Sequence, residues 1–248
     1  MPESVSIICL SRGNIDIVGR AVGILNGAQS EFDFQVSPDL VELPPLELGQ
    51  AYSWAMLESV LSREKQRLEA EYLFGVLDQP IENNWFSRTV PGQRLCFITT
   101  KDWEYLSNLS VNTFAAYEIV ENLSEMLVEE IEAHEETRGC LYDMCAIKPH
   151  ISFKIRTGDI CADCLDTLNE KLPAPTVQSL IAMLEAVRRE ALGRGTPPQG
   201  RGESSSLAEV VDREFPFPIA YCFRSMQGEL TYSRKWLKAL ELYEVIIK

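Results

Sequence analysis

The stretch CLYDMCAIKPHISFKIRTGDICADC, residues 140–164, decides how this part of the chain folds, because it places four cysteines in two close pairs. Cys140 and Cys145 have four residues between them, and Cys161 and Cys164 have two. Thiolates at these spacings can turn back onto one ion, and a longer insert brings the second pair to the opposite side of a tetrahedron. The spacing predicts a four-cysteine zinc knuckle with Cys140, Cys145, Cys161 and Cys164 as ligands.

The expected role of this Zn²⁺ is structural, because four protein ligands leave no open coordination position for a substrate. Folding of residues 140–164 would then be coupled to metal binding. Three alternatives remain open for the same residues. They are an iron–sulfur cluster, a redox sensor in which the paired thiols cycle between dithiol and disulfide, and four thiols without a shared ligand.

Composition favours a reduced, cytoplasmic protein with an ample core. The chain has 248 residues, 46% of them apolar, and an odd number of cysteines, seven. Three of these cysteines sit singly in apolar surroundings, as reduced core thiols do. The sequence starts without a charged and then apolar leader, and no apolar run approaches the roughly 18 residues of a membrane span. We therefore expect a cytoplasmic chain with no membrane partner.

The charge balance argues against nucleic acid as the main ligand. The formal net charge is −14, with 23 basic residues against 37 acidic ones. Binding to phosphates draws its affinity from clustered lysine and arginine. An acidic surface instead favours solubility.

Strands and helices alternate along the first 192 residues. The apolar patterns predict strands at 5–10, 32–36, 72–77 and 94–99, and helices at 15–25, 51–71, 113–136 and 175–192. Residues 83–88 are predicted to be a polar loop that leads to a turn at Pro91 and Gly92. The alternation predicts an α/β (α+β) fold, a mixed sheet with flanking helices.

The composition changes after this domain, residues 1–192. Residues 193–206 are rich in Gly, Pro and Ser and predict a flexible linker. Residues 207–248 form the expected helical C-terminal extension, because Trp236, Leu240, Tyr243 and Ile247 recur at helical spacing. The apolar pattern runs to the last residues, so we expect the natural chain to continue past Lys248.

The region of residues 72–172 resembles the archaemetzincins, a group of zinc peptidases. In that family a catalytic helix ends in HExxHxxGxxHC, and its final cysteine begins a second zinc site with C-x4-C and C-x2-C pairs. This chain has a strand at 94–99, a long predicted helix and the cysteine pattern in the same order. The resemblance implies a metzincin-like fold and a zinc-binding domain.

The chain departs from the family at the catalytic motif. Alignment on Cys140 places the three family histidines at Glu129, Ala133 and Gly139, with Glu130 at the general base. A catalytic zinc of this class needs three neutral imidazoles and an open position for water. The whole chain has two histidines, so a three-histidine centre cannot form and the resemblance implies a pseudopeptidase.

Glu130 and His134 are the remaining candidates for a catalytic site. They are four residues apart on the predicted helix, where i and i+4 side chains are neighbours. His134 also continues the apolar stripe of Val120, Leu123 and Leu127, which favours a buried histidine with an ordinary hydrogen bond.

Motifs of other enzyme classes are absent: the sequence has no GxSxG, P-loop or GxGxxG pattern. We therefore expect a catalytically inactive recognition or regulatory module within a larger protein or assembly, such as a multidomain bacterial protein. Its expected partner is a protein or peptide, held by protein–protein interaction. The alternative is a zinc metallopeptidase with non-standard ligands, built on His134 and nearby carboxylates.

Overall fold

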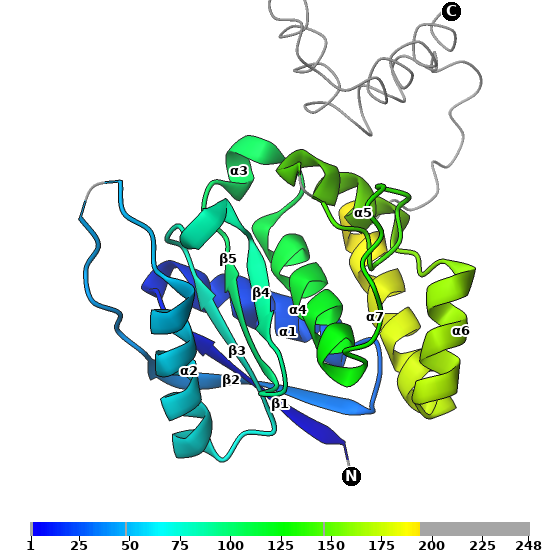
Figure 1. Cartoon of the computed structure of the whole chain (residues 1–248), viewed down its shortest axis with the longest axis horizontal. Coiled ribbons are helices and arrows are strands. Elements are labelled where there is room, and N and C mark those ends of the chain that lie inside the picture. The colour runs from blue at the N-terminus through cyan, green and yellow to red at the C-terminus, as the bar shows by residue number, and fades with distance from the viewer. Residues whose placement is uncertain (1, 48, 146, 194–248) are drawn as a thin grey trace, which may run out of the picture.

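The computed structural model describes residues 2–47, 49–145 and 147–193. These residues form a five-stranded sheet with helices on both faces (Figure 1). The strands are β1 (Glu3–Cys9), β2 (Phe32–Leu40), β3 (Tyr72–Leu77), β4 (Ser87–Val90) and β5 (Leu95–Thr99). Their order in the sheet is β2-β1-β3-β5-β4. All neighbours pair in parallel except β4, which runs antiparallel to β5 at one edge.

The helices are α1 (Ile15–Asn26), α2 (Trp54–Leu68), α3 (Trp103–Leu106), α4 (Val111–Leu127), α5 (Ile151–Thr157), α6 (Ala162–Lys171) and α7 (Ala174–Ala191). Short 3-10 turns lie at Arg12–Asn14, Glu82–Asn84 and Lys148–His150. Helix α2 covers one face of the sheet, and α1, α4 and α7 cover the other (Figure 1). The predicted α/β class with a mixed sheet and flanking helices is confirmed.

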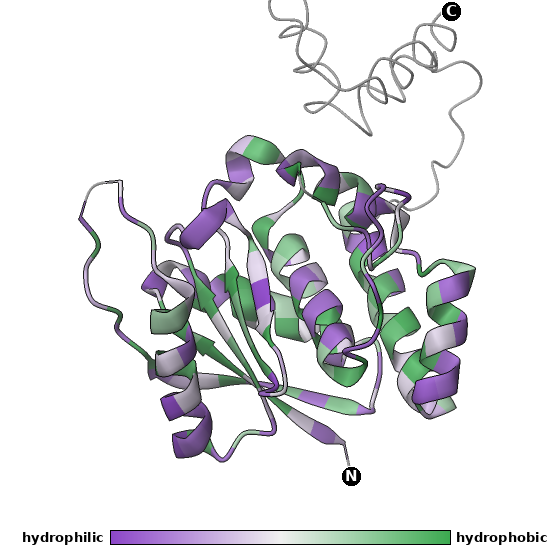
Figure 2. Cartoon of the chain, in the orientation of Figure 1, coloured by the Kyte–Doolittle hydropathy of each residue, from purple (hydrophilic) through white to green (hydrophobic). Residues whose placement is uncertain are grey.

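Two hydrophobic clusters follow from the period of two along each strand. Val5, Ile7 and Cys9 of β1 face α1 and α4, whereas Ile8 and Leu10 face α2. The central strands are accordingly hydrophobic along their length, while α2 and α6 carry hydrophilic outer faces (Figure 2). Parallel strands that are covered on both faces are expected to have this composition.

Residues 83–88 were predicted to be a polar loop, and the structure places the start of an edge strand, β4, at Ser87. Residues 87–90 alternate Ser, Arg, Thr and Val, a pattern with little apolar signal of its own. Pairing with β5 holds the strand, and the aromatic ring of Phe86 just before it packs at 4.9 Å from Phe114 of α4. Tertiary contacts therefore override the polar local sequence.

The long predicted helix at 113–136 is also shorter than expected. Helix α4 begins after the cap Ser110, whose side chain accepts a hydrogen bond from the Thr113 amide, and ends at Leu127. Val128 leaves helical geometry, and residues 128–133 lead to an extended segment at His134. Helices α5 and α6 were not predicted from the sequence. Helix α5 lies in the insert between the cysteine pairs, and α6 begins within the second pair.

The predicted linker at 193–206 and the C-terminal extension at 207–248 lie outside the described residues, apart from Gly193. Among the residues that are described, no helix combines the length and the apolarity of a membrane span.

Gly75 of β3 provides a test of how closely α2 packs on the sheet. A Cβ atom at Gly75 would lie 2.6 Å from Leu61 Cδ2, so Gly75→Ala is expected to lower the free energy of unfolding by about 1–3 kcal/mol through overpacking. Urea unfolding measures the change. Gly23→Ala on α1 is the matched control, because its Cβ would meet nothing within 4 Å. There alanine is expected to raise stability by about 0.5–1 kcal/mol. Equal effects at both positions would contradict the packing.

Candidate metal centre

Four side chains from three separate segments converge beside α6. They are His134, Cys140, Cys161 and Cys164, and their candidate ligand atoms all lie within 4.8 Å of one another. Cys140 and Cys164 are buried, and His134 and Cys161 are half-buried. Within the described ranges, these four residues form the group of His, Cys, Asp or Glu side chains whose ligand atoms lie close enough to hold one metal ion.

Cys161 and Cys164 are positioned by the start of α6. Cys161 is the N-cap residue and Cys164 lies in the first turn, so both thiols are on the same side of the helix end. The N-terminus of a helix favours negative charge, which suits thiolates. The Cys161 backbone amide donates to Cys140 Sγ at 3.3 Å and joins the two pairs.

Two short bridges hold the other two residues in place. The backbone of His134 pairs with the segment at Asp143, with the His134 amide donating to Tyr142 O at 2.8 Å and the Met144 amide donating to His134 O at 2.8 Å. Cys140 pairs in parallel with Asp159, because the Leu141 amide donates to Asp159 O at 2.8 Å. The centre is therefore built on extended backbone segments and not on the end of a long helix.

Asp143 organises the loop before Cys140. Its Oδ2 atom accepts hydrogen bonds from the amides of Arg138, Gly139 and Cys140 at 2.5, 2.6 and 3.1 Å. Three successive amides around one carboxylate form an anion nest. Gly139 has a φ of +92°, and a Cβ atom there would lie 2.7 Å from Thr157 Oγ1. Only glycine fits this tight loop without displacing Thr157.

The chemistry of this donor set fits Zn²⁺. Three thiols and one imidazole are a standard ligand set for tetrahedral zinc. His134 Nε2 lies 3.2 Å from both Cys161 Sγ and Cys164 Sγ. Bond lengths of about 2.1 Å to nitrogen and 2.3 Å to sulfur would separate such a pair by about 3.6 Å around one tetrahedral ion. The atoms are therefore close to the spacing that zinc requires.

The thiols depend on a cation for their ionisation. Burial raises the pKa of the Cys164 thiol, and hydrogen bonding to Cys161 and the charge of Cys140 raise it further. Burial also raises the pKa of Cys140. A bound divalent cation would remove these protons, so metal affinity is expected to rise with pH.

Cys145 differs from its predicted role. The structure brings together Cys140, Cys161 and Cys164, but His134 and not Cys145 completes the group. The segment from Tyr142 to Met144 is hydrogen-bonded to His134. Beyond it, the thiol of Cys145 is influenced by the charges of Lys154 and Glu121. Burial raises the pKa of this thiol to about 12, with Lys154 opposing the rise and Glu121 adding to it. A six-residue step from His134 to Cys140, ahead of a C-x2-C pair, is the sequence signal for the fourth ligand.

Glu130 does not join His134. Its carboxylate forms an ion pair with Lys171 of α6 and its side chain is 68% exposed. Because α4 ends at Leu127, Glu130 and His134 are not one helical turn apart as predicted. The other histidine, His150, lies 3.2 Å by its Nδ1 atom from Thr137 Oγ1.

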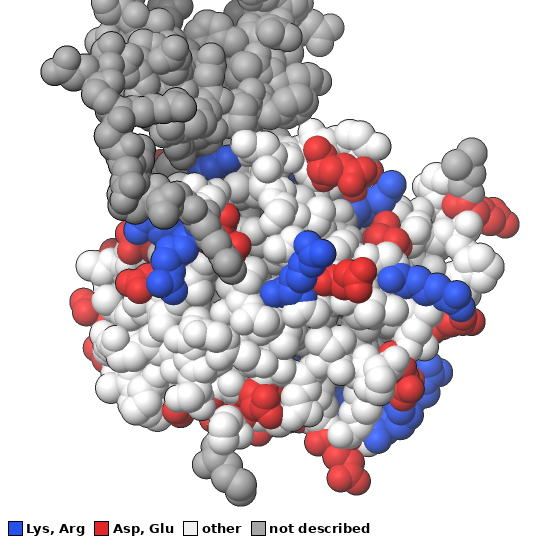
Figure 3. All heavy atoms as spheres, turned by 180° about the vertical axis from the view of Figure 1, so that it is seen from behind, with Lys and Arg blue, Asp and Glu red and all other residues white. Residues whose placement is uncertain are grey.

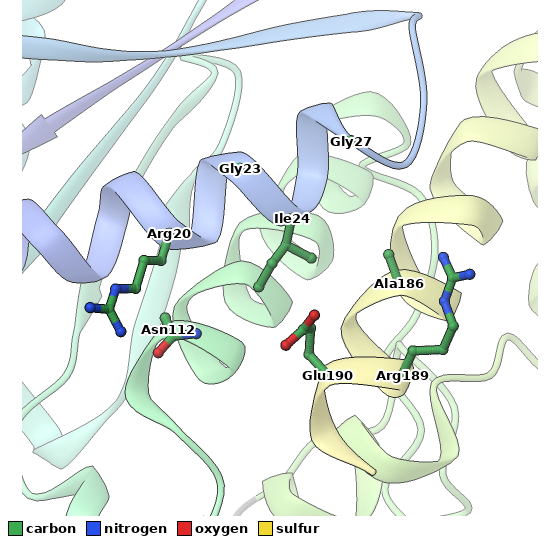
Figure 4. Close-up of a pocket in the computed structure, with 8 residues that line it drawn as sticks. All are labelled: Arg20, Gly23, Ile24, Gly27, Asn112, Ala186, Arg189 and Glu190. Carbon is green, nitrogen blue, oxygen red and sulfur yellow. The ribbon is translucent and has the colours of Figure 1, made fainter. Parts of the chain in front are cut away.

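A cleft of about 630 Å³ lies elsewhere, between α1 and α7 (Figure 4). It is lined by Arg20, Gly23, Ile24, Gly27, Asn112, Ala186, Arg189 and Glu190. Glu190 points toward Ile24 and Asn112, while Arg20 and Arg189 point away from the space (Figure 4). The cleft does not gather side chains of one charge around a ligand position.

Comparison with known proteins supports the fold. No family model matches the sequence, and no curated protein sequence matches it. Among solved structures, archaemetzincin from Methanopyrus kandleri matches with a TM-score of 0.52 and 12% identity, covering 68% of this chain and 95% of the archaemetzincin. A zinc-dependent peptidase from Methanocorpusculum labreanum matches with a TM-score of 0.49 and 13% identity, covering 66% of this chain and all of the peptidase. The first of these matches shows that the chain has a fold like that of archaemetzincin, as the sequence predicted.

The ligand set can be tested by metal analysis of single variants. The full chain is expected to bind one zinc ion, and Cys145→Ser is expected to keep it. His134→Ala is expected to weaken zinc binding at least as much as the roughly 10–100-fold loss that follows removal of a ligand's supporting partner. Competition with a chromogenic chelator measures the affinity, and cobalt(II) substitution reports the number of thiolates. Zinc loss in Cys145→Ser with retention in His134→Ala would support the four-cysteine set instead.

The Asp143 nest provides a second test of the same centre. Asp143→Asn removes the charge that faces three amides, including that of the ligand Cys140. Zinc affinity is expected to fall on the order of 10–100-fold with the stoichiometry unchanged. Asp163→Asn, on α6 beside the cysteine pair, serves as the control because no such nest surrounds it. An unchanged affinity in Asp143→Asn would show that the nest does not support the ligands.

Proposed function

We propose that this chain is a zinc-stabilised, catalytically inactive domain that acts as a recognition or regulatory module in the cytoplasm. The observation that carries the proposal is the convergence of His134, Cys140, Cys161 and Cys164 on one position. Four protein ligands would fill the coordination sphere of zinc, so the ion would hold three chain segments together without activating water. The zinc is therefore assigned a structural role.

The absence of a second set of ligands supports inactivity. The sequence has two histidines, one in the cysteine group and the other beside Thr137. No further group of metal ligands converges within the described part of the chain. A peptidase of this fold would need a metal with an open position.

The edge strand β4 is the surface that we propose for a protein or peptide partner. It lies at the end of the sheet order, so one side of its backbone has no strand partner among the described residues. The Thr99 amide donates to Phe86 O at 2.6 Å, which places Phe86 in a hydrogen-bonded pair with β5. Because antiparallel pairs alternate, the backbone groups of Ser87 and Thr89 point away from β5. They are available for an added strand.

Side chains beside β4 favour recognition of an extended peptide. Trp85, just before the strand, is 46% exposed. The guanidinium of Arg88 lies 3.7 Å from the ring centroid of Trp54, and the Trp54 and Trp85 rings meet edge to face at 5.8 Å. Such aromatic and arginine surfaces are typical of protein interfaces. Charged groups of both signs are interspersed on the face shown in Figure 3, where no single-sign surface suggests nucleic acid.

Binding can be tested with a random peptide display library and the full, zinc-loaded chain. Selected peptides are expected to shift the NMR signals of the Ser87 and Thr89 amides and to slow their hydrogen exchange. Trp85→Ala is expected to weaken binding by about 1–3 kcal/mol, as loss of an aromatic contact does. Tyr105→Ala is the control, because Tyr105 of α3 is exposed without lying on β4. Peptides that bind without affecting Ser87 or Thr89 would contradict the β4 surface.

The alternative of a metallopeptidase with non-standard ligands is tested by the metal count. One zinc per chain, together with no hydrolysis of an unfolded protein such as casein, is expected for the module. Two ions per chain, with cleavage that stops on chelation and returns on adding zinc, would instead support the peptidase.

A further inference from the structure

Helix α4 buries three carboxyl groups on one side. Glu118, Glu121 and Glu125 are spaced by three and four residues, so they share the helix face toward β4 and α5. Glu118 is only 2% exposed, the side chain of Glu121 is 16% exposed and Glu125 is half-buried. Buried carboxylates are costly unless each is paired or protonated.

The carboxyl groups connect α4 to its neighbours. Lys154 Nζ of α5 lies 2.5 Å from Glu121 Oε1 and also donates to Asp143 O at 2.7 Å. Thr89 Oγ1 of β4 donates to Glu125 Oε2 at 3.1 Å. Glu118 is hydrogen-bonded to Ser87 of β4. The inward side chains of the edge strand therefore bind directly to this acidic face.

Positive charge is too scarce to neutralise all three groups. Lys154 is 1% exposed and is engaged by Glu121. Lys148 also attracts Glu118, but its ammonium lies over the Phe86 ring at 3.9 Å and donates to Asn84. The other titratable groups that interact electrostatically with these carboxyl groups carry no positive charge. They are Cys96 of β5, Tyr117 of α4, and Tyr142, Asp143 and Cys145 of the loop before α5.

The hydroxyl of Tyr117 indicates independently that this interior polar region is short of partners. Tyr117 is 1% exposed, and its hydroxyl has no hydrogen-bond partner within the described structure. Burial raises the pKa of this hydroxyl, and repulsion from Glu121 and Glu118 raises it further. Neighbouring carboxyl groups that share a single ammonium favour a proton on those that it does not pair with.

The pKa values of the carboxyl groups agree with this geometry. Burial raises the pKa of Glu118 to about 8, with repulsion from Glu121 as the next cause. Burial raises the pKa of Glu125 to about 7, again with a contribution from Glu121. The pKa of Glu121 is also raised by burial, although Lys154 opposes the rise.

We propose that Glu118 and Glu125, beside the Lys154-paired Glu121, form a buried proton-binding site that keeps β4 packed on α4, and that loss of these protons at alkaline pH loosens the strand. The ligand is a proton and not a metal ion, since the carboxylate oxygens do not form one of the converging ligand groups within the described residues. The proposed site affects the stability of the chain itself, so it does not depend on whether a peptide binds β4.

The sign of the pH dependence follows from linkage. In the unfolded chain the carboxyl groups release their protons near the ordinary pKa of 4.5, whereas in the folded chain Glu125 and Glu118 keep them up to about pH 7 and 8. The folded state therefore binds more protons between these limits. The stability that this provides is present below the ordinary pKa and is lost as pH rises through the folded pKa values.

The test compares the full, zinc-saturated chain with Glu118→Gln between pH 5.5 and 8.5. Glutamine resembles the protonated carboxyl, so the two proteins are expected to be similar in stability at pH 5.5. Above that, the unfolding equilibrium constant of the parent chain is expected to rise up to about tenfold more per pH unit than that of the variant, one proton being involved. Urea unfolding at each pH measures the difference. Glu185→Gln, an exposed position on α7, is the control and is expected to keep the parent slope.

Carboxyl-carbon NMR on the unaltered chain keeps the proposal testable if Glu118→Gln does not fold. Glu118 and Glu125 are expected to titrate near pH 8 and 7, and the β4 amides are expected to lose exchange protection, after correction for intrinsic rates, over the same range. Midpoints below pH 5 for both groups, equal slopes for Glu118→Gln and the parent chain, or unchanged β4 protection up to pH 8.5 would each overturn the proposal.

Discussion

The burial of helix α4 is the constraint on which the rest of this molecule depends. The helix packs against α1 and α7 and against β4 and β5 of the sheet, and most of its residues are buried, polar ones included. Its apolar side chains supply the centre of the larger hydrophobic cluster. Its carboxyl groups must then find partners or keep protons, because the interior offers them little water. Lys154 forms an ion pair with Glu121, and the Thr89 hydroxyl of β4 donates a hydrogen bond to Glu125.

The same helix determines where the metal centre can form. Because α4 ends at Leu127, the following residues can turn away and bring His134 in an extended segment to the cysteines. A helix extended to residue 136 would have carried His134 along the helix face. The short backbone bridges at Asp143 and Asp159, and not a helix, hold His134 and Cys140 in position. The hydrogen bonds from backbone amides to Asp143 fix the loop between these two residues. Metal and loop would therefore stabilise each other.

The archaemetzincin-like fold of this chain does not by itself determine the chemistry of its converging His and Cys residues. The fold is shared with an archaemetzincin at 12% identity, a level at which fold and function need not coincide. The edge strand, the sheet order and the helix behind them do not require a catalytic metal. They depend on aromatic contacts such as Phe86 with Trp103 and Phe114, and on the polar contacts between β4 and α4.

The sequence by itself determined the fold class, and three of the four cysteines that it singled out lie in the converging group. Alternation of buried β-branched runs with amphipathic stretches is a local signal, and the close spacing within each cysteine pair allows its thiols to turn toward one ion. Only the tertiary structure decided that His134 takes the place expected for Cys145, because that depends on where α4 ends and how residues 128–139 fold back. Strand β4 was likewise undecided, since its Ser, Arg and Thr residues become a strand by pairing with β5 and binding α4. Both the position of His134 and the conformation of β4 depend on contacts between residues distant in sequence, which no local pattern encodes.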